Sequence, residues 1–128
     1  MNPSTTIGRH KISSRFTANV RIAFIEYPTS EELLPVYSDF MKTILSHPLF
    51  GGSLANSSKK LSQFLIELFS SVKSNFSIDE HRHYLFTPRD ITQLIFSLLR
   101  YEIKDAQTLV EVLIYESSRI FKDRLVDK

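Results

Sequence analysis

The sequence predicts a mainly α-helical domain: a bundle of about four helices, preceded by a short loop and one β-strand. Apolar side chains recur three and four residues apart in four separate stretches, which is the period of an amphipathic helix. Pro, Gly and Ser residues separate these stretches, as expected for connecting loops. One segment nearer the N-terminus instead has the β-branched and aromatic composition of a strand.

Residues 1–28 form a basic leader that ends in this predicted strand. Four bases and one acid lie there, whereas residues 29–128 hold twelve bases and thirteen acids. Residues 19–27 are rich in β-branched and aromatic side chains, and Pro28 ends the segment. Both faces of this strand are largely apolar, so it needs cover on both sides, as in a parallel α/β sheet. Because one strand cannot form a sheet, we expect the segment to depend on chain outside the bundle.

The first predicted helix begins after Thr29, which forms a capping box with Glu32. Pro35 removes one backbone hydrogen bond early in this helix and is expected to kink its first turns. The helix ends before His47, which precedes a proline. Its apolar stripe consists of Leu33, Tyr37, Phe40, Met41 and Ile44.

Three further helices follow. The second begins near Ser57 or Ser58, and the fourth begins near Asp105. The third begins at Thr87 and has Pro88 at its first helical position, where the missing N–H costs least. Their apolar faces comprise Leu61, Phe64, Leu65, Leu68, Phe69 and Val72, then Ile91, Leu94, Ile95, Leu98 and Leu99, then Leu109, Val112, Leu113, Ile120 and Phe121. Apolar stripes that face one another predict a helical bundle.

Composition excludes several classes of protein. With 128 residues, 42% of them apolar and 23% charged, the chain has the makeup of one folded domain. A net charge of +2 does not favour nucleic acid or an anionic membrane as a partner. The lack of Cys excludes a disulfide scaffold, a Cys-zinc site and a thiol nucleophile. No apolar run is long enough for a spanning helix, and the polar N-terminus does not resemble a signal peptide, so we expect a soluble intracellular domain.

Local motifs also argue against chemistry by this chain alone. The sequence contains no phosphate-binding G-x-x-x-x-G-K-[ST] loop and no G-x-S-x-G nucleophile elbow around Ser13, Ser14 or His10. His81 and His83 are two residues apart with no third His nearby, which favours a polar loop over a metal site. We therefore predict no metal and no nucleotide hydrolysis by the isolated chain.

Two arginines are candidates for phosphate contacts. Arg15 follows the polar leader, where a guanidinium could bind a phosphate in bidentate fashion; the alternative is a solvated surface arginine. Arg89 lies in the first turn of the third predicted helix, where backbone N–H groups and a guanidinium together form an anion site. The alternative for Arg89 is an exposed side chain paired with Asp90 or with a neighbouring helix.

Three stretches resemble the C-terminal part of an AAA+ module of a dynein heavy chain. The leader contains N-P-S-T-T-x-G-R-H and S-R-F, and is followed by a strand that ends in Y-P. His83–Ile91 resembles the family's H-Y-x-F-[ST]-P-R-[DE] stretch, and Glu116–Arg124 resembles its E-x-x-R-x-F-x-D-R element. The resemblance covers essentially the whole chain. The leader and the F-T-x-x-V-R-I strand are similar to the third module of the cytoplasmic dynein 2 type, the motor of intraflagellar transport.

This resemblance implies a role for each part of the chain. Residues 1–28 would be the end of the large AAA+ subdomain, and residues 29–128 the α-helical lid. Asn2 falls at sensor 1, near the γ-phosphate. Arg15 falls at the arginine finger, which acts in trans on the neighbouring module, and Arg89 at sensor 2, which contacts nucleotide in its own module.

The resemblance further implies a fragment of a microtubule minus-end-directed motor of the cytoplasm, cytoskeleton and cilium or flagellum. The lid would contribute to ATP binding and relay nucleotide-dependent motion to the rest of its module and to neighbouring modules. Microtubules would be reached only through distant parts of the motor, without nucleic acid or membrane insertion. ATP or ADP with Mg²⁺ would bind the intact motor, whereas the fragment lacks the Walker A and Walker B elements and should neither hold nucleotide tightly nor hydrolyse it alone.

A different reading of the same residues is a stand-alone helical protein-interaction domain that binds no nucleotide. Its leader and strand would join the sheet edge of a partner. A small independent enzyme has less support, because no acid–base or nucleophile constellation is present in the sequence.

Overall fold

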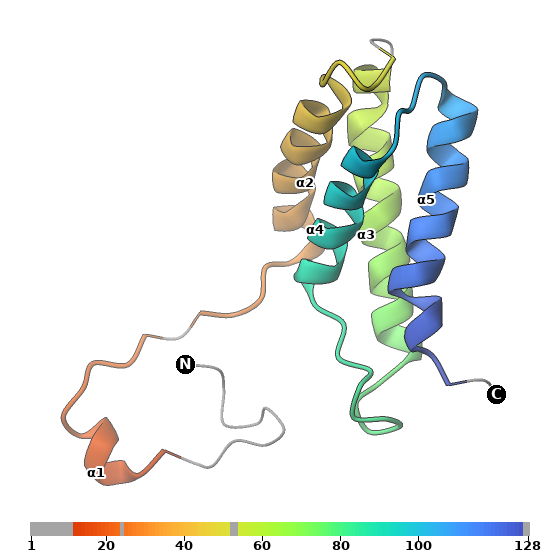
Figure 1. The fold of residues 1–128 in the computed structure, drawn as a ribbon. Coiled ribbons are helices and arrows are strands. Elements are labelled where there is room, and N and C mark those ends of the chain that lie inside the picture. The colour runs from red at the N-terminus through yellow and green to blue at the C-terminus, as the bar shows by residue number, and fades with distance from the viewer. Residues whose placement is uncertain (1–11, 24, 52–53, 127–128) are drawn as a thin grey trace.

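The computed structural model of the chain describes residues 12–23, 25–51 and 54–126. Four of the described helices form a bundle, and a fifth, of four residues, lies in the leader (Figure 1). The helices are α1 (Ser14–Thr17), α2 (Ser30–Leu45), α3 (Ser58–Asn75), α4 (Pro88–Ser97) and α5 (Ala106–Ile120), with 3₁₀ turns η1 (Leu54–Ser57), η2 (Leu98–Arg100) and η3 (Lys122–Arg124). In the described part of the chain, no helix is long and apolar enough to cross a membrane.

The predicted helix starts are confirmed, and those of α2, α4 and α5 depend on a local cap. Thr29 and Glu32 form the capping box of α2, and that helix continues through Pro35 as one element. Thr87 and Asp90 form a second capping box at α4, which has Pro88 in its first turn. The side chain of Asp105 accepts a hydrogen bond from the backbone of Thr108 at the start of α5.

The short helix α4 is central to the bundle, because it packs against α2, α3 and α5. Its inward side chains Ile91, Leu94 and Ile95 are each 1% exposed. Removing such side chains from water is the main favourable contribution to folding. The position of α4 therefore depends on the three longer helices around it.

Loop residues complete the core at the end of the bundle where α2 joins α3 and α4 joins α5 (Figure 1). Phe50 and Ile103 are buried and pair as an isolated parallel β-bridge. The Ile103 N–H donates to the Leu49 carbonyl, and the Gly51 N–H donates to the Ile103 carbonyl, both at 3.0 Å. A Cβ at Gly51 would overlap the carbonyl oxygen of Lys104, so this close approach requires glycine.

The β-strand predicted for residues 19–27 is not present among the described residues, which exclude Phe24. This segment is extended but pairs with no other described segment, and it runs away from the bundle in Figure 1. Its apolar residues Val20, Ile22 and Ile25 are 42%, 63% and 92% exposed. A strand needs the hydrogen bonds of a neighbouring strand, and the described chain supplies none. The segment that forms α1 (Ser14–Thr17) was expected to be part of a loop.

The predicted apolar faces were partly wrong at their edges. Phe40, Phe64 and Leu99 were expected to face inward but are 42%, 54% and 39% exposed. Ile66 was not expected in the core and is 5% exposed. A stripe drawn at spacings of three and four is wider than the surface that neighbouring helices cover, so residues at its margins were misplaced.

Candidate functional site

The N-termini of α2 and α4 lie at the same end of the bundle, beside the C-terminal half of α3 (Figure 1). A pocket of about 410 Å³ opens between them. Its wall is formed by residues 27–30 and Leu33, by one side of α3 between Phe69 and Ser74, and by Pro88. We call it the hinge pocket, because residues 27–30 connect the leader to the bundle.

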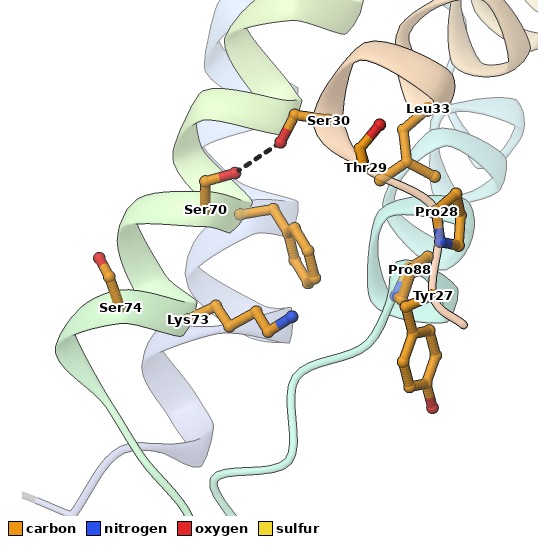
Figure 2. A pocket seen from close by; sticks show the side chains of 10 residues that line it. Tyr27, Pro28, Thr29, Ser30, Leu33, Ser70, Lys73, Ser74 and Pro88 are labelled. Carbon is orange, nitrogen blue, oxygen red and sulfur yellow. Dashed lines mark hydrogen bonds between the residues drawn. The ribbon is translucent and has the colours of Figure 1, made fainter.

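The hinge pocket combines an apolar floor with one cation. Leu33 and Phe69 are buried in its wall, and Lys73 is the only charged residue in the part of its lining that the structure describes. Figure 2 shows Lys73 extending from α3 toward the side of the pocket on which Pro88 lies. The hydroxyl oxygens of Ser30 and Ser70 are 3.5 Å apart and join α2 to α3 at the pocket's edge. This arrangement suits a ligand with an apolar part and an anionic part.

Arg89 directly follows the pocket residue Pro88 and is the second residue of α4. Its side chain is exposed and forms no hydrogen bond or ion pair with any described residue. The first N–H groups of a helix also have no partner within the helix, and they favour anions. Arg89 therefore stands at a helix N-terminus, where the sequence predicted it, and its charge is available.

The contacts of the Asp90 carboxylate explain why it does not pair with the guanidinium of Arg89. One carboxylate oxygen of Asp90 accepts a hydrogen bond from the Thr87 N–H at 2.7 Å. The other accepts one from Nη1 of Arg124 at 2.9 Å. The alternative in which Arg89 pairs with Asp90 is thus not the arrangement found.

Arg124 is a structural residue whose contacts were not predicted from the sequence. Its Nη2 donates to the carbonyl oxygens of Leu85, at 2.9 Å, and His83, at 3.3 Å. Its guanidinium carbon lies 4.7 Å from the centre of the Phe86 ring. The only sequence signal was that Arg124 ends the E-x-x-R-x-F-x-D-R stretch, which says nothing about spatial neighbours.

Glu116 is the most buried acid among the described residues, at 1% exposed. It accepts a hydrogen bond from the Tyr101 hydroxyl at 2.7 Å and two from Arg119, from Nε at 2.9 Å and Nη2 at 2.7 Å. Burial alone would raise the pKa of Glu116, but these hydrogen bonds and the Arg119 charge hold it below its ordinary value. The hydrogen bond from Tyr101 to Glu116 also raises the pKa of the Tyr101 hydroxyl. This cluster links α5 to the segment after α4.

The other two predicted site residues lie away from the hinge pocket or outside the described residues. Arg15 is exposed on α1, away from the bundle in Figure 1, and so is not brought to Arg89. Asn2 lies outside the described residues.

The two loop histidines pack against an aromatic side chain. The rings of His81 and His83 lie 5.5 Å apart and meet the Tyr84 ring edge-on at 4.9 Å and 4.8 Å, between centroids. Across the residues that the structure describes, no group of three or more His, Cys, Asp or Glu residues could hold a metal ion.

Comparison with known proteins identifies relatives for the whole chain. Residues 40–128 match the family model described as dynein heavy chain, ATPase lid domain. The chain is 42% identical to cytoplasmic dynein 2 heavy chain 1 of Tripneustes gratilla, 35% to that of Chlamydomonas reinhardtii and 33% to that of Mus musculus. Each alignment covers 98% of this chain but only 3% of the relative, so the chain spans a small part of the curated proteins it matches.

Proposed function

The chain belongs to the dynein heavy chain family and carries its ATPase lid domain, and on that premise we propose that the bundle is a nucleotide-responsive lid of an AAA+ motor module. The observation that carries the proposal is the guanidinium of Arg89, which no described residue pairs with, at the N-terminus of α4 beside the hinge pocket. In this role Arg89 binds a phosphate of the nucleotide held by its own module, as sensor 2.

ATP or ADP fits the residues at this end of the bundle. Arg89, the first turn of α4 and the cation of Lys73 suit the phosphates, while the apolar wall around Leu33 suits the base of a nucleotide. The described lining of the pocket contains no carboxylate, so Mg²⁺ would be held by other parts of the module. When bound, the nucleotide supplies the hydrolysable phosphoanhydride, and the lid's residues bind and orient it.

Residues 1–28 would complete the large subdomain, and the segment 27–30 would be the hinge. Apolar side chains such as Ile22 and Ile25 are exposed in the chain alone, which supports a site of addition to a sheet. The bundle has one continuous core, so it would move as a unit about the hinge and relay nucleotide state to the neighbouring module. Arg15, on the leader side of the hinge, would be the arginine finger acting in trans, and Asn2 would be sensor 1.

At the level of the motor, we assign this lid to the third module of a cytoplasmic dynein 2 heavy chain. The relatives named above support that class. The motor would work in intraflagellar transport, in the cytoplasm and cilium, and reach microtubules through other parts of the heavy chain.

The sensor 2 role is tested with Arg89→Ala in the intact heavy chain, with the other nucleotide sites inactivated. Loss of one charge-assisted contact should weaken the binding of a fluorescent ADP analogue by about tenfold. Arg100→Ala is the matched control, because Arg100 is also exposed and forms no ion pair with a described residue but lies in η2, beyond the other end of α4. Equal affinity of the Arg89 variant and wild type would refute the role.

The arginine-finger role is tested with Arg15→Ala in the same heavy chain. Hydrolysis by the neighbouring module should slow by at least about tenfold, because a finger stabilises charge on the transferred phosphoryl group. An unchanged ATPase rate together with unchanged microtubule gliding would remove this role from Arg15.

A further inference from the structure

The loop that leads into α4 has little regular structure to hold it. Between the end of α3 and Pro88 the described chain forms turns, and its backbone carbonyls at His83 and Leu85 point to the same side chain, that of Arg124. Arg124 donates to both carbonyls and to the Asp90 carboxylate. One side chain thus joins both ends of the segment that determines where α4 begins.

The geometry of this contact needs arginine in particular. A planar guanidinium presents several N–H donors in a fixed fork, whereas an ammonium group is a single point charge. Arg124 uses that fork in two directions and stacks its face on the Phe86 ring. The backbone N–H of Val126 also donates to the Tyr84 hydroxyl at 3.0 Å, so the segment after α5 has a second attachment to the loop.

Arg89 is the residue that this arrangement places. It precedes Asp90 in the first turn of α4, and Asp90 is only 8% exposed. Without Arg124 the Asp90 carboxylate would be a buried charge with no partner cation, which favours a shift of the whole turn. We propose that Arg124 is the positioning residue for Arg89: it fixes the first turn of α4 from the C-terminal side of the bundle, so that Arg89 is held ready for a phosphate. The proposal rests on the nucleotide role of Arg89 proposed above.

Arg119 provides a matched control. It lies on the same end of α5 and forms an ion pair with Glu116 of similar length, 2.7 Å against 2.9 Å for Arg124 and Asp90. Among the described residues its side chain donates hydrogen bonds to Glu116 alone, so none reaches the first turn of α4. Arg119→Gln therefore removes an equivalent charge and ion pair without touching the start of α4.

The positional claim is tested by NMR on the 128-residue chain. In Arg124→Gln the Thr87 and Val126 amides should exchange with solvent about tenfold faster, and the Arg89 amide signal should shift. Arg119→Gln should leave all three unchanged. If Arg124→Gln does not fold, Arg124→Lys keeps the charge beside Asp90 without the fork and should change the same signals to a smaller extent. Unchanged signals at these positions in a folded Arg124 variant would overturn the proposal.

The functional arm is a double-mutant cycle in the intact heavy chain, measured with the fluorescent ADP analogue. Arg124→Gln should weaken binding by up to about tenfold when Arg89 is present and cause no further loss in an Arg89→Ala background. An equal loss in both backgrounds would indicate general damage to the lid and would overturn the positioning role. If Arg89→Ala alone binds as tightly as wild type, the nucleotide role falls, and the exchange experiment decides separately whether Arg124 fixes the start of α4.

Discussion

Replacing Glu116 with Gln should make the stability of the bundle less dependent on pH. The substitution keeps the size of the side chain and leaves an oxygen that can accept the hydrogen bond from Tyr101. It places an amide, a donor, where Arg119 directs two donors of its own. The Glu116 variant therefore loses the charge-assisted part of the cluster without creating a cavity.

The expected magnitude follows from these contacts. Hydrogen bonds to a charged group contribute about 1.5–3 kcal/mol, and Glu116 is 1% exposed, so water cannot replace its partners. The side chain of Arg119 is 42% exposed, so water can solvate its charge in the variant and offset part of the loss. We expect the free energy of unfolding of Glu116→Gln to fall by about 1–2 kcal/mol at neutral pH.

The sign of the pH dependence follows from the lowered pKa of Glu116. A group whose pKa is lower in the folded chain stabilises it fully above the ordinary value of 4.5 and loses that contribution as pH falls through the folded value. The difference between wild type and the Glu116 variant should therefore shrink as the pH falls below 4.5. Glu32 and Asp105 also have lowered pKa values, but they are present in both proteins and cancel.

Urea unfolding at several pH values, followed by circular dichroism, measures this difference. Glu111→Gln is the control, because Glu111 is exposed on the same helix and accepts a hydrogen bond only from Gln107 among the described residues. The control should differ little from wild type at any pH. A Glu116 variant that is as stable as wild type, or whose deficit is the same at pH values above and below 4.5, would refute the reasoning.

Two further substitutions test the packing. Gly51→Ala should destabilise the chain by about 1–3 kcal/mol, because the new Cβ meets the Lys104 carbonyl. Faster hydrogen exchange of the Ile103 amide would show that the change acts at this contact. A variant as stable as wild type would count against the close approach. Leu98→Ala should lower the free energy of unfolding in urea by about 2–5 kcal/mol, because Leu98 is 0% exposed and its loss leaves a cavity. Leu99 is exposed, so Leu99→Ala is the control. Equal losses of stability in the two variants would show that Leu98 is not part of the core.

The sequence was sufficient to predict features that depend on near neighbours. Thr29, Thr87 and Asp105 each cap a helix through residues no more than three positions away, and all three helix starts were predicted. Burial in the loops was not predicted, because Tyr84, Phe86 and their neighbours follow no periodic pattern and are covered by distant segments. Periodicity shows which side chains share one face of a helix, but not which part of that face a neighbouring helix will cover.

The candidate site also has features that the sequence predicted and features that it did not. The place of Arg89 at a helix N-terminus was predictable from the T-P-R-D stretch. Its freedom from Asp90 was not, since that depends on Arg124, which lies 34 residues away from Asp90 along the chain. The strand expected in the leader from its composition is not formed among the described residues, because a strand needs a neighbouring strand and they supply none.

The parallel bridge between Phe50 and Ile103 makes the two ends of the bundle mechanically different. At that end, two backbone hydrogen bonds fasten the α2–α3 connection to the α4–α5 connection. At the hinge end, side chains make the connections: the Tyr37 hydroxyl donates to the Pro88 carbonyl at 2.6 Å, and Arg124 joins Asp90 to the loop before α4. A force that enters through the hinge therefore meets side-chain ties first and a backbone tie last. Because both ends are tied and the core between them is continuous, the bundle would transmit such a force along its length without its helices spreading apart.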